Sequence, residues 1–193
     1  MAQYTRKAIR QTFLEMLREM PFDKITVSAL VNRCEVSSNT FYYHYHDIFD
    51  LLSSWLSDEL APLLSADENS WKECLIALLE RMQAHPEVVY HLSSSTLRER
   101  MERHIFLATN DFFDHYISFH TFAHPLSAEQ KKSMADFCRY AFLGFVARFI
   151  WNRMEGNVRQ SVEGLERLME QFVIGANVQL QKTLGSARED RSC

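Results

Sequence analysis

The sequence predicts an all-helical fold. Its 193 residues include only 5 Gly and 4 Pro, so the turns that separate β-strands are scarce. Apolar residues recur at intervals of three and four over most of the chain, which is the period of an amphipathic helix. Apolar residues make up 47% of the chain and charged residues 24%, which is typical of a folded globular protein rather than a disordered one.

The first expected helix spans residues 3–20. Ile9, Phe13, Met16 and Leu17 recur at helical spacing and form one apolar face. Pro21 ends this helix, because a proline pushes the residue before it away from helical dihedral angles.

Three further helices are expected before the next proline. The second starts at the N-cap residue Thr26, and the third covers residues 38–45 after a second cap residue, Ser37. The fourth spans residues 47–60, and Pro62 closes it. Two short helices joined by a brief turn, with a longer helix on each side, indicate a helix-turn-helix unit. An ordinary helical hairpin has the same spacing, so this pattern alone leaves both interpretations open.

The rest of the chain is expected to be five helices. They are predicted at residues 71–84, 87–94, 96–120, 128–155 and 161–183. Ser127 and Gln130, three residues apart, form a capping-box pattern before the fourth of them. The second half of that helix, RYAFLGFVARFIWNRM, is apolar nearly all round, so it has to be buried on every side.

A second copy of the chain is the expected cover for this apolar helix. Helices 128–155 and 161–183 would pair with their symmetry mates in a four-helix interface, which makes the protein a homodimer. Gly144 would let the backbones approach closely. In the alternative interpretation, the helix is the centre of the monomer's own core.

Several classes of protein find no support in the sequence. No run of about 18 uninterrupted apolar residues predicts a membrane span, and the polar start MAQYTRKAIRQ lacks a signal core, so a cytoplasmic protein is expected. The four cysteines lie far apart, form no CxxC pair and are expected to be reduced. No nucleophile elbow, phosphate-binding loop or paired carboxylate signature occurs, so we expect no catalytic residues, no cofactor and no enzyme activity.

Histidine pairs do not predict a metal site either. His44 and His46 are two residues apart, so on a helix they point to different faces. His120 and His124 have the spacing of neighbours on a helix, but Pro125 and the expected helix end separate them.

The segment VSSNTFYYHYHD, residues 36–47, divides by face when it is placed on a helix. Phe41 and Tyr45 are four residues apart and point to the core. Asn39, Tyr42, Tyr43 and His46 lie on the other side and face outward. Exposed tyrosines on a short helix are unusual unless they meet a partner.

Charge does not mark the chain as a nucleic-acid-binding protein. The net charge is −4, and residues 1–56 contain six basic and six acidic residues. Three of the basic residues, Arg6, Lys7 and Arg10, do cluster in the first helix.

Residues 25–52, ITVSALVNRCEVSSNTFYYHYHDIFDLL, resemble the DNA-binding segment of the TetR/AcrR-type transcriptional regulators. The matching positions are Thr26, Leu30, Val36, Ser37, Thr40, Phe41, Tyr42, His44, Tyr45, Leu51 and Leu52. The string YYHYHDIFDLL, with the looser pattern of Gly144, Trp151, Gly156 and Ser161, is similar to the subgroup of dihydroxyacetone-kinase operon regulators. The resemblance implies an N-terminal three-helix helix-turn-helix domain, a C-terminal helical bundle that dimerises, and a pseudo-palindromic double-stranded DNA operator.

The resemblance also implies a function and a division of the chain. Residues 1–56 would be the helix-turn-helix DNA-binding domain, residues 57–185 the effector-binding and dimerisation domain, and residues 186–193 a flexible tail. We expect a sequence-specific transcriptional regulator, and specifically a repressor that a small-molecule effector releases. The sequence does not separate repression from activation and does not identify the effector.

The expected DNA contacts follow from the matching positions and from side-chain chemistry. Asn39 can bond adenine in bidentate fashion, Ser38 can donate or accept, and Tyr43 can pack on a thymine methyl or a sugar. Polar tips and hydroxyls elsewhere suit phosphate oxygens. The whole set is Arg6, Lys7, Arg10, Thr26, Ser37, Ser38, Asn39, Thr40, Tyr42, Tyr43 and His44. So few cations predict a modest salt dependence, roughly three or four released ions per monomer.

The family usually keeps a ligand pocket among the middle helices. The candidate lining residues are His91, Met101, His104, Phe112, His115, Tyr116 and Phe145.

Three positions depart from the family pattern, and two of them, Glu35 and Ile48, leave a second hypothesis open. Glu35 stands at the family's turn glycine, and a positive φ there would cost up to about 1 kcal/mol. Ile48 replaces a lysine that commonly meets a phosphate, and Asn39 replaces a small or basic residue. The alternative function is therefore a helical dimer of the same fold that acts as a co-regulator through a protein partner, without binding DNA.

Overall fold

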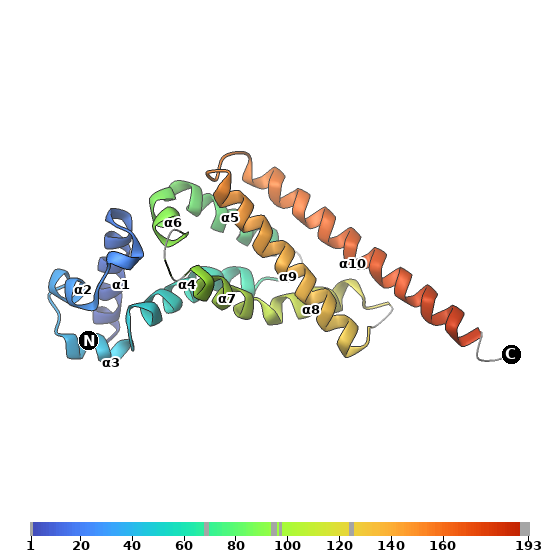
Figure 1. The fold of residues 1–193 in the computed structure, drawn as a ribbon, viewed down its shortest axis with the longest axis horizontal. Coiled ribbons are helices and arrows are strands. Elements are labelled where there is room, and N and C mark those ends of the chain that lie inside the picture. Colours follow the sequence, from blue (N-terminus) through green and yellow to red (C-terminus); the bar gives the residue numbers. More distant parts are fainter. Residues whose placement is uncertain (1, 68–69, 94–95, 97, 124–125, 190–193) are drawn as a thin grey trace.

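The computed structural model describes residues 2–67, 70–93, 96, 98–123 and 126–189, and these residues form helices and connecting turns with no strand among them (Figure 1). The all-helical prediction is confirmed for this part of the chain. The helices are α1 (Ala2–Glu19), α2 (Val27–Arg33), α3 (Ser38–His44), α4 (Ile48–Leu64), α5 (Trp71–Ala84), α6 (Pro86–Ser93), α7 (Arg98–Ala108), α8 (Asn110–His120), α9 (Ala128–Trp151) and α10 (Val158–Glu189). A short 3-10 helix, Phe22–Lys24, follows α1.

The N-terminal helices form where the sequence predicts them, because their caps are in place. The Thr26 hydroxyl accepts from the Ala29 N–H at 3.1 Å, and the Ser37 hydroxyl accepts from the Thr40 N–H at 3.1 Å. Ser127 and Gln130 form the predicted capping box at the start of α9.

The predicted end of the fourth helix is wrong. Pro62 does not stop α4, which continues to Leu64. Its ring removes one N–H donor but fixes φ at a value that the helix also uses, so the chain can continue for two residues beyond it.

The single helix predicted over residues 96–120 is also wrong. The chain breaks at Thr109 into α7 and α8. The Thr109 side chain is buried, and its hydroxyl donates to the Phe106 carbonyl oxygen at 3.0 Å. A threonine that bonds its own preceding turn competes with the continuous helical pattern.

The last helix starts earlier and ends later than predicted. Asn157 lies before the predicted start at residue 161, and its side chain accepts from the Gln160 N–H at 2.9 Å. α10 therefore begins at Val158 and runs to Glu189, beyond the expected end at residue 183. The predicted flexible tail overlaps the last turn of α10, and its residues 190–193 lie outside the described residues.

Two clusters of buried side chains form the interior. The first joins α1 to α4 and includes Phe41, Leu51 and Leu52, together with Val88 and Leu92 of α6. The second fills the bundle of α4, α5, α8, α9 and α10. α4 is shared by both, since its first half packs in one cluster and its second half, at Leu63, packs in the other.

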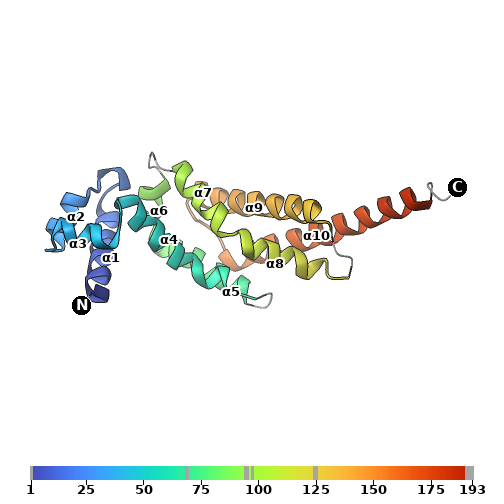
Figure 2. The ribbon, with the colours of Figure 1, turned by 90° about the horizontal axis from the view of Figure 1, so that it is seen from below.

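The helix-turn-helix end and the bundle lie at opposite ends of an elongated molecule (Figure 1). α9 and α10 run beside each other, and α10 projects past the rest of the bundle at its C-terminal end in both views (Figures 1 and 2). Among the described helices, none is both long enough and apolar enough to cross a membrane.

Candidate nucleic-acid interface

The turn between α2 and α3 is a well-defined helix ending. The Val36 N–H donates to the Val31 carbonyl oxygen at 3.1 Å, and both side chains belong to the same apolar cluster. This is the Schellman arrangement, which places the intervening residue in the left-handed region. That residue is Glu35, with φ 55°. A non-glycine residue thus occupies a backbone conformation that favours glycine.

α3 presents the predicted outward face. Phe41 is fully buried, and Tyr45, directly after the helix, is 4% exposed. On the other side Tyr42 is 56% exposed, Tyr43 is 79% exposed, and Asn39 is also exposed. The division of the aromatic run into two core rings and an outward face is therefore confirmed.

The outward rings are held by contacts within α3. Tyr42 packs its edge against Phe41, with ring centroids 5.5 Å apart at 87°. Tyr43 packs against His44 in the same way, at 5.0 Å and 81°. These contacts limit the freedom of two exposed side chains before any partner arrives, which lowers the entropy lost on binding.

Hydroxyl groups at the start of α3 are partly engaged with each other. Ser37 Oγ and Thr40 Oγ1 are 2.8 Å apart, so one of the two hydroxyl protons lies between them. The other proton remains able to donate outward. Thr26 Oγ1 accepts from the backbone, which also leaves its proton available as a donor. Both helix starts therefore combine a cap with a hydroxyl donor.

Three of the six basic residues in residues 1–56 form hydrogen bonds or ion pairs within the protein. Arg33 donates to both carboxylate oxygens of Glu19 at 2.5 and 2.6 Å, and this hydrogen bonding lowers the pKa of Glu19. Arg6 contacts the Tyr45 hydroxyl and Ser54, and Arg10 is ion-paired with Asp58. The other three, which have no hydrogen-bond or ion-pair partner among the described residues, are Lys7, Arg18 and Lys24.

The predicted effector residues do not share one pocket. His91 Nδ1 donates to the Leu17 carbonyl oxygen at 2.6 Å, which ties α6 to α1. Met101 packs against the N-terminal cluster, and His104 Nε2 lies 3.1 Å from the Ser57 hydroxyl on α4. His115 is exposed on α8, and Phe145 lines a groove between α9 and α10.

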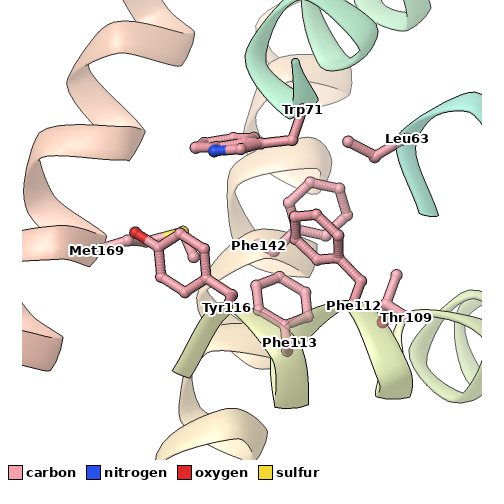
Figure 3. A pocket seen from close by; sticks show the side chains of 8 residues that line it. All are labelled: Leu63, Trp71, Thr109, Phe112, Phe113, Tyr116, Phe142 and Met169. Atoms are coloured by element: carbon pink, nitrogen blue, oxygen red, sulfur yellow. The ribbon is translucent and has the colours of Figure 1, made fainter. Parts of the chain in front are cut away.

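Phe112 and Tyr116 do meet in the interior. They line a small cavity whose walls come from α4, α5, α8, α9, α10 and the α7–α8 break (Figure 3). The lining residues are Leu63, Trp71, Thr109, Phe112, Phe113, Tyr116, Phe142 and Met169. None of them is charged. The sequence does not single out the other six as a site, because their approach depends on the packing of separate helices.

The cavity is closed in this conformation. Its volume of about 10 Å³ suits at most one water molecule. Trp71 packs edge-on against Tyr116 and Phe112, with centroid distances of 6.2 and 6.3 Å. A larger ligand could enter only if one or more of these rings moved.

Two titratable groups of the bundle are shifted by burial. Burial raises the pKa of the Cys138 thiol to about 12. Burial also lowers the pKa of His120, whose ring lies 4.4 Å from the Tyr116 ring. Within the described residues no group of three His, Cys, Asp or Glu side chains could hold a metal ion, and His124 lies outside them.

α9 and α10 border a groove that exposes several apolar side chains beside polar ones. A groove of about 570 Å³ runs between them and includes Phe137, Gly144, Leu168 and Phe172. Leu168 is 69% exposed, and the Phe137 and Phe172 rings stack at 4.3 Å. A Cβ added at Gly144 would meet nothing within 4 Å, so space is left beside this position of α9.

Comparisons with known proteins agree with this architecture. A family described as "Transcriptional regulator C-terminal region", of the TetR type, matches residues 69–171, which is more than half of the chain. A solved structure named "Dihydroxyacetone kinase operon activator DhaS" superimposes with a TM-score of 0.64 over 88% of this chain and 96% of that chain, at 15% sequence identity. No curated protein matches the sequence. The chain belongs to the TetR-type family of transcriptional regulators.

Proposed function

We propose that the protein regulates transcription by binding a pseudo-palindromic DNA operator as a homodimer. The outward face of α3 is the observation that carries this proposal. Two exposed tyrosines and an exposed asparagine stand on a short helix that two caps and a buried phenylalanine hold in place. In a helix-turn-helix unit, this is the helix whose first residues enter the major groove.

Each residue of the face has a role that fits its chemistry. Asn39 would read adenine through two hydrogen bonds, Ser38 would contact a neighbouring base edge, and Tyr43 would pack on a thymine methyl or a sugar. Tyr42 and His44 would donate to phosphate oxygens. The hydroxyls of Thr26, Ser37 and Thr40 would make further contacts with the phosphates of the DNA.

Few cations support the binding, so its salt dependence should be weak. Lys7 is the basic residue of the α1 cluster that has no partner within the described structure. The slope of log affinity against log salt should correspond to roughly three or four released ions per monomer at most. A slope well above ten per dimer would contradict this set of contacts.

The homodimer would form through α9 and α10. Their groove exposes apolar side chains such as Leu168 and Phe137, and exposed apolar side chains that lie together are typical of an interaction surface. A two-fold dimer would place this face against the same face of a second copy. The predicted interface of helices 128–155 and 161–183 corresponds to these two helices.

The aromatic cavity is the position that we propose for a small-molecule effector. Because it is closed and uncharged, an effector would have to be small, uncharged and able to displace a ring such as half-buried Phe112. Binding would then favour a second conformation of the bundle. The residues predicted from the family pattern contribute Phe112 and Tyr116 to this cavity, and the other five lie elsewhere.

The direction of regulation and the site of action are part of the same proposal. We predict repression by the unliganded dimer, in the compartment that holds the DNA, with no catalytic activity. A reporter gene behind the bound operator tests the direction: expression should rise when the regulator is deleted. A fall in expression would identify an activator.

Selection of bound fragments from random DNA tests the proposed function itself. The full chain should enrich one pseudo-palindromic sequence, and the same sequence should shift in a gel with the protein at submicromolar concentration. If no sequence is enriched while the protein is folded and dimeric, DNA binding is refuted. The alternative function, a co-regulator that acts through a protein partner, would then remain.

A further inference from the structure

Two arginines of α1 contact side chains of α4. Arg6 donates to the Ser54 hydroxyl at 2.9 Å, and Arg10 is ion-paired with the Asp58 carboxylate. The two arginines are four residues apart on α1, and their partners are four residues apart on α4. Residues at this spacing lie on the same face of a helix, so the two contacts are neighbours, one turn apart along each helix.

The Arg6 side chain also contacts the end of α3. Arg6 Nε donates to the Tyr45 hydroxyl at 3.2 Å, and the Arg6 guanidinium lies 5.9 Å from the centroid of the Tyr45 ring. This hydrogen bond raises the pKa of Arg6. Tyr45 is the C-cap of α3 and packs with Phe41 at 5.7 Å. Arg6 thus connects α1, α4 and the end of the proposed reading helix.

The contacts of Arg6 and Arg10 with α4 lie between the two apolar clusters that share this helix. Leu51 and Leu52 anchor the first half of α4 among α1, α2 and α3, and Leu63 anchors its far end in the bundle. Ser54 and Asp58 fall between these anchors. Side chains at this point are therefore placed where contacts with α1 could influence the direction of α4.

We propose that Arg6 and Arg10 are positioning residues, and that they hold α4 against α1 instead of binding phosphate. We name the set Arg6, Arg10, Tyr45, Ser54 and Asp58 the α1–α4 clamp. In a dimer, the angle of α4 sets the separation of the two α3 helices, which has to match half-sites about 34 Å apart. This inference rests on the proposed function, because it assigns a role within DNA binding.

Charge balance supports the assignment. The Asp58 carboxylate already neutralises Arg10, so a phosphate would have to displace it to gain the contact. Lys7, between the two arginines in sequence, has no such partner within the described residues and is left for phosphate. The basic cluster of α1 therefore divides into two positioning residues and one candidate phosphate contact.

Arg10→Ala, Asp58→Ala, the double variant and Lys7→Ala test the assignment with the selected operator. As a clamp, Arg10→Ala and Asp58→Ala should weaken binding to the same extent, on the order of ten-fold for a dimer with two such exposed pairs. The double variant should bind no worse than either single one, and the salt slope should not change. Lys7→Ala, the matched control, should lower the slope by about 2 per dimer.

A phosphate contact at Arg10 gives the opposite pattern. Arg10→Ala would then lower the salt slope by about 2 per dimer, and Asp58→Ala would strengthen binding by freeing the cation. Either result overturns the clamp. The reversed pair, Arg10→Asp with Asp58→Arg, should restore affinity if the clamp is correct, and its failure to bind better than Arg10→Asp alone would contradict it.

Hydrogen exchange without DNA separates this inference from the proposed function. Arg10→Ala and Asp58→Ala should both speed exchange of the α4 amides near residues 54–58, while α8 amides keep their rates. Unchanged exchange in α4 overturns the clamp. If the wild-type chain selects no DNA sequence but exchange responds as expected, the proposed function fails and the clamp stands.

Discussion

Replacing Glu35 by glycine should stabilise the protein. Glu35 has φ 55°, a left-handed conformation in which the side chain of an ordinary residue crowds the backbone. That crowding costs roughly 1–2 kcal/mol, and glycine avoids it. Glycine in turn adds about 0.5–1 kcal/mol of conformational freedom to the unfolded chain. The difference between these two ranges centres on a net gain of about 0.75 kcal/mol in the free energy of unfolding, within the cost of up to about 1 kcal/mol expected from the sequence.

Urea and thermal unfolding measure this gain. For a chain of this length, the expected rise in Tm is about 1–4 °C, with an unchanged urea m-value. Glu35→Ala separates the backbone effect from the loss of an exposed charge, because alanine keeps the Cβ. Asn32→Gly, in the last turn of α2, is the control with helical geometry and should destabilise. If Glu35→Ala stabilises as much as Glu35→Gly, the gain comes from charge and the conformational argument is refuted.

Three further predictions concern the bundle. Leu168→Glu should convert the dimer to a folded monomer in sedimentation experiments, because Leu168 is 69% exposed on the apolar groove, and a variant that stays dimeric would exclude this face. Arg167→Glu, on a neighbouring face of α10, is its control. Cys138, with its pKa raised to about 12, should resist a thiol reagent at pH 8 until urea unfolds the protein, and rapid labelling in the native state would contradict its burial. Burial lowers the pKa of His120, so the imidazole binds a proton more readily in the unfolded chain than in the folded one. The free energy of unfolding should therefore fall as the pH drops through about 6.5, the pKa of an unperturbed histidine. His120→Gln should flatten that loss, and an unchanged pH profile would exclude His120 as its source.

Local chemistry made the N-terminal half predictable. Thr26 and Ser37 are cap residues that stand directly before apolar periodic segments, and the structure uses both as caps. The division of Phe41 and Tyr45 from Asn39, Tyr42 and Tyr43 follows from helical geometry alone, since the helix is short and amphipathic. The positive φ of Glu35 could be anticipated as well, because this residue stands where the family pattern has glycine.

The bundle was harder to predict because its details depend on contacts between distant residues. Periodicity runs through Thr109 without interruption, and only its burial and its hydrogen bond to Phe106 reveal the break. The cavity brings together side chains from five helices, whose approach no single segment encodes. Sequence proximity grouped Arg6, Lys7 and Arg10, but two of them turn toward α4, where Ser54 and Asp58 stand more than 40 residues away.

The affinity of Asn39→Ala and Tyr43→Ala for the selected operator tests the proposed reading face most directly. Asn39 and Tyr43 are exposed, so neither substitution should alter the fold or the dimer. Fluorescence anisotropy should show each variant binding at least about ten-fold more weakly to the operator, with its affinity for unrelated DNA unchanged. Full operator affinity in both variants would contradict the assignment of α3 as the helix that reads DNA.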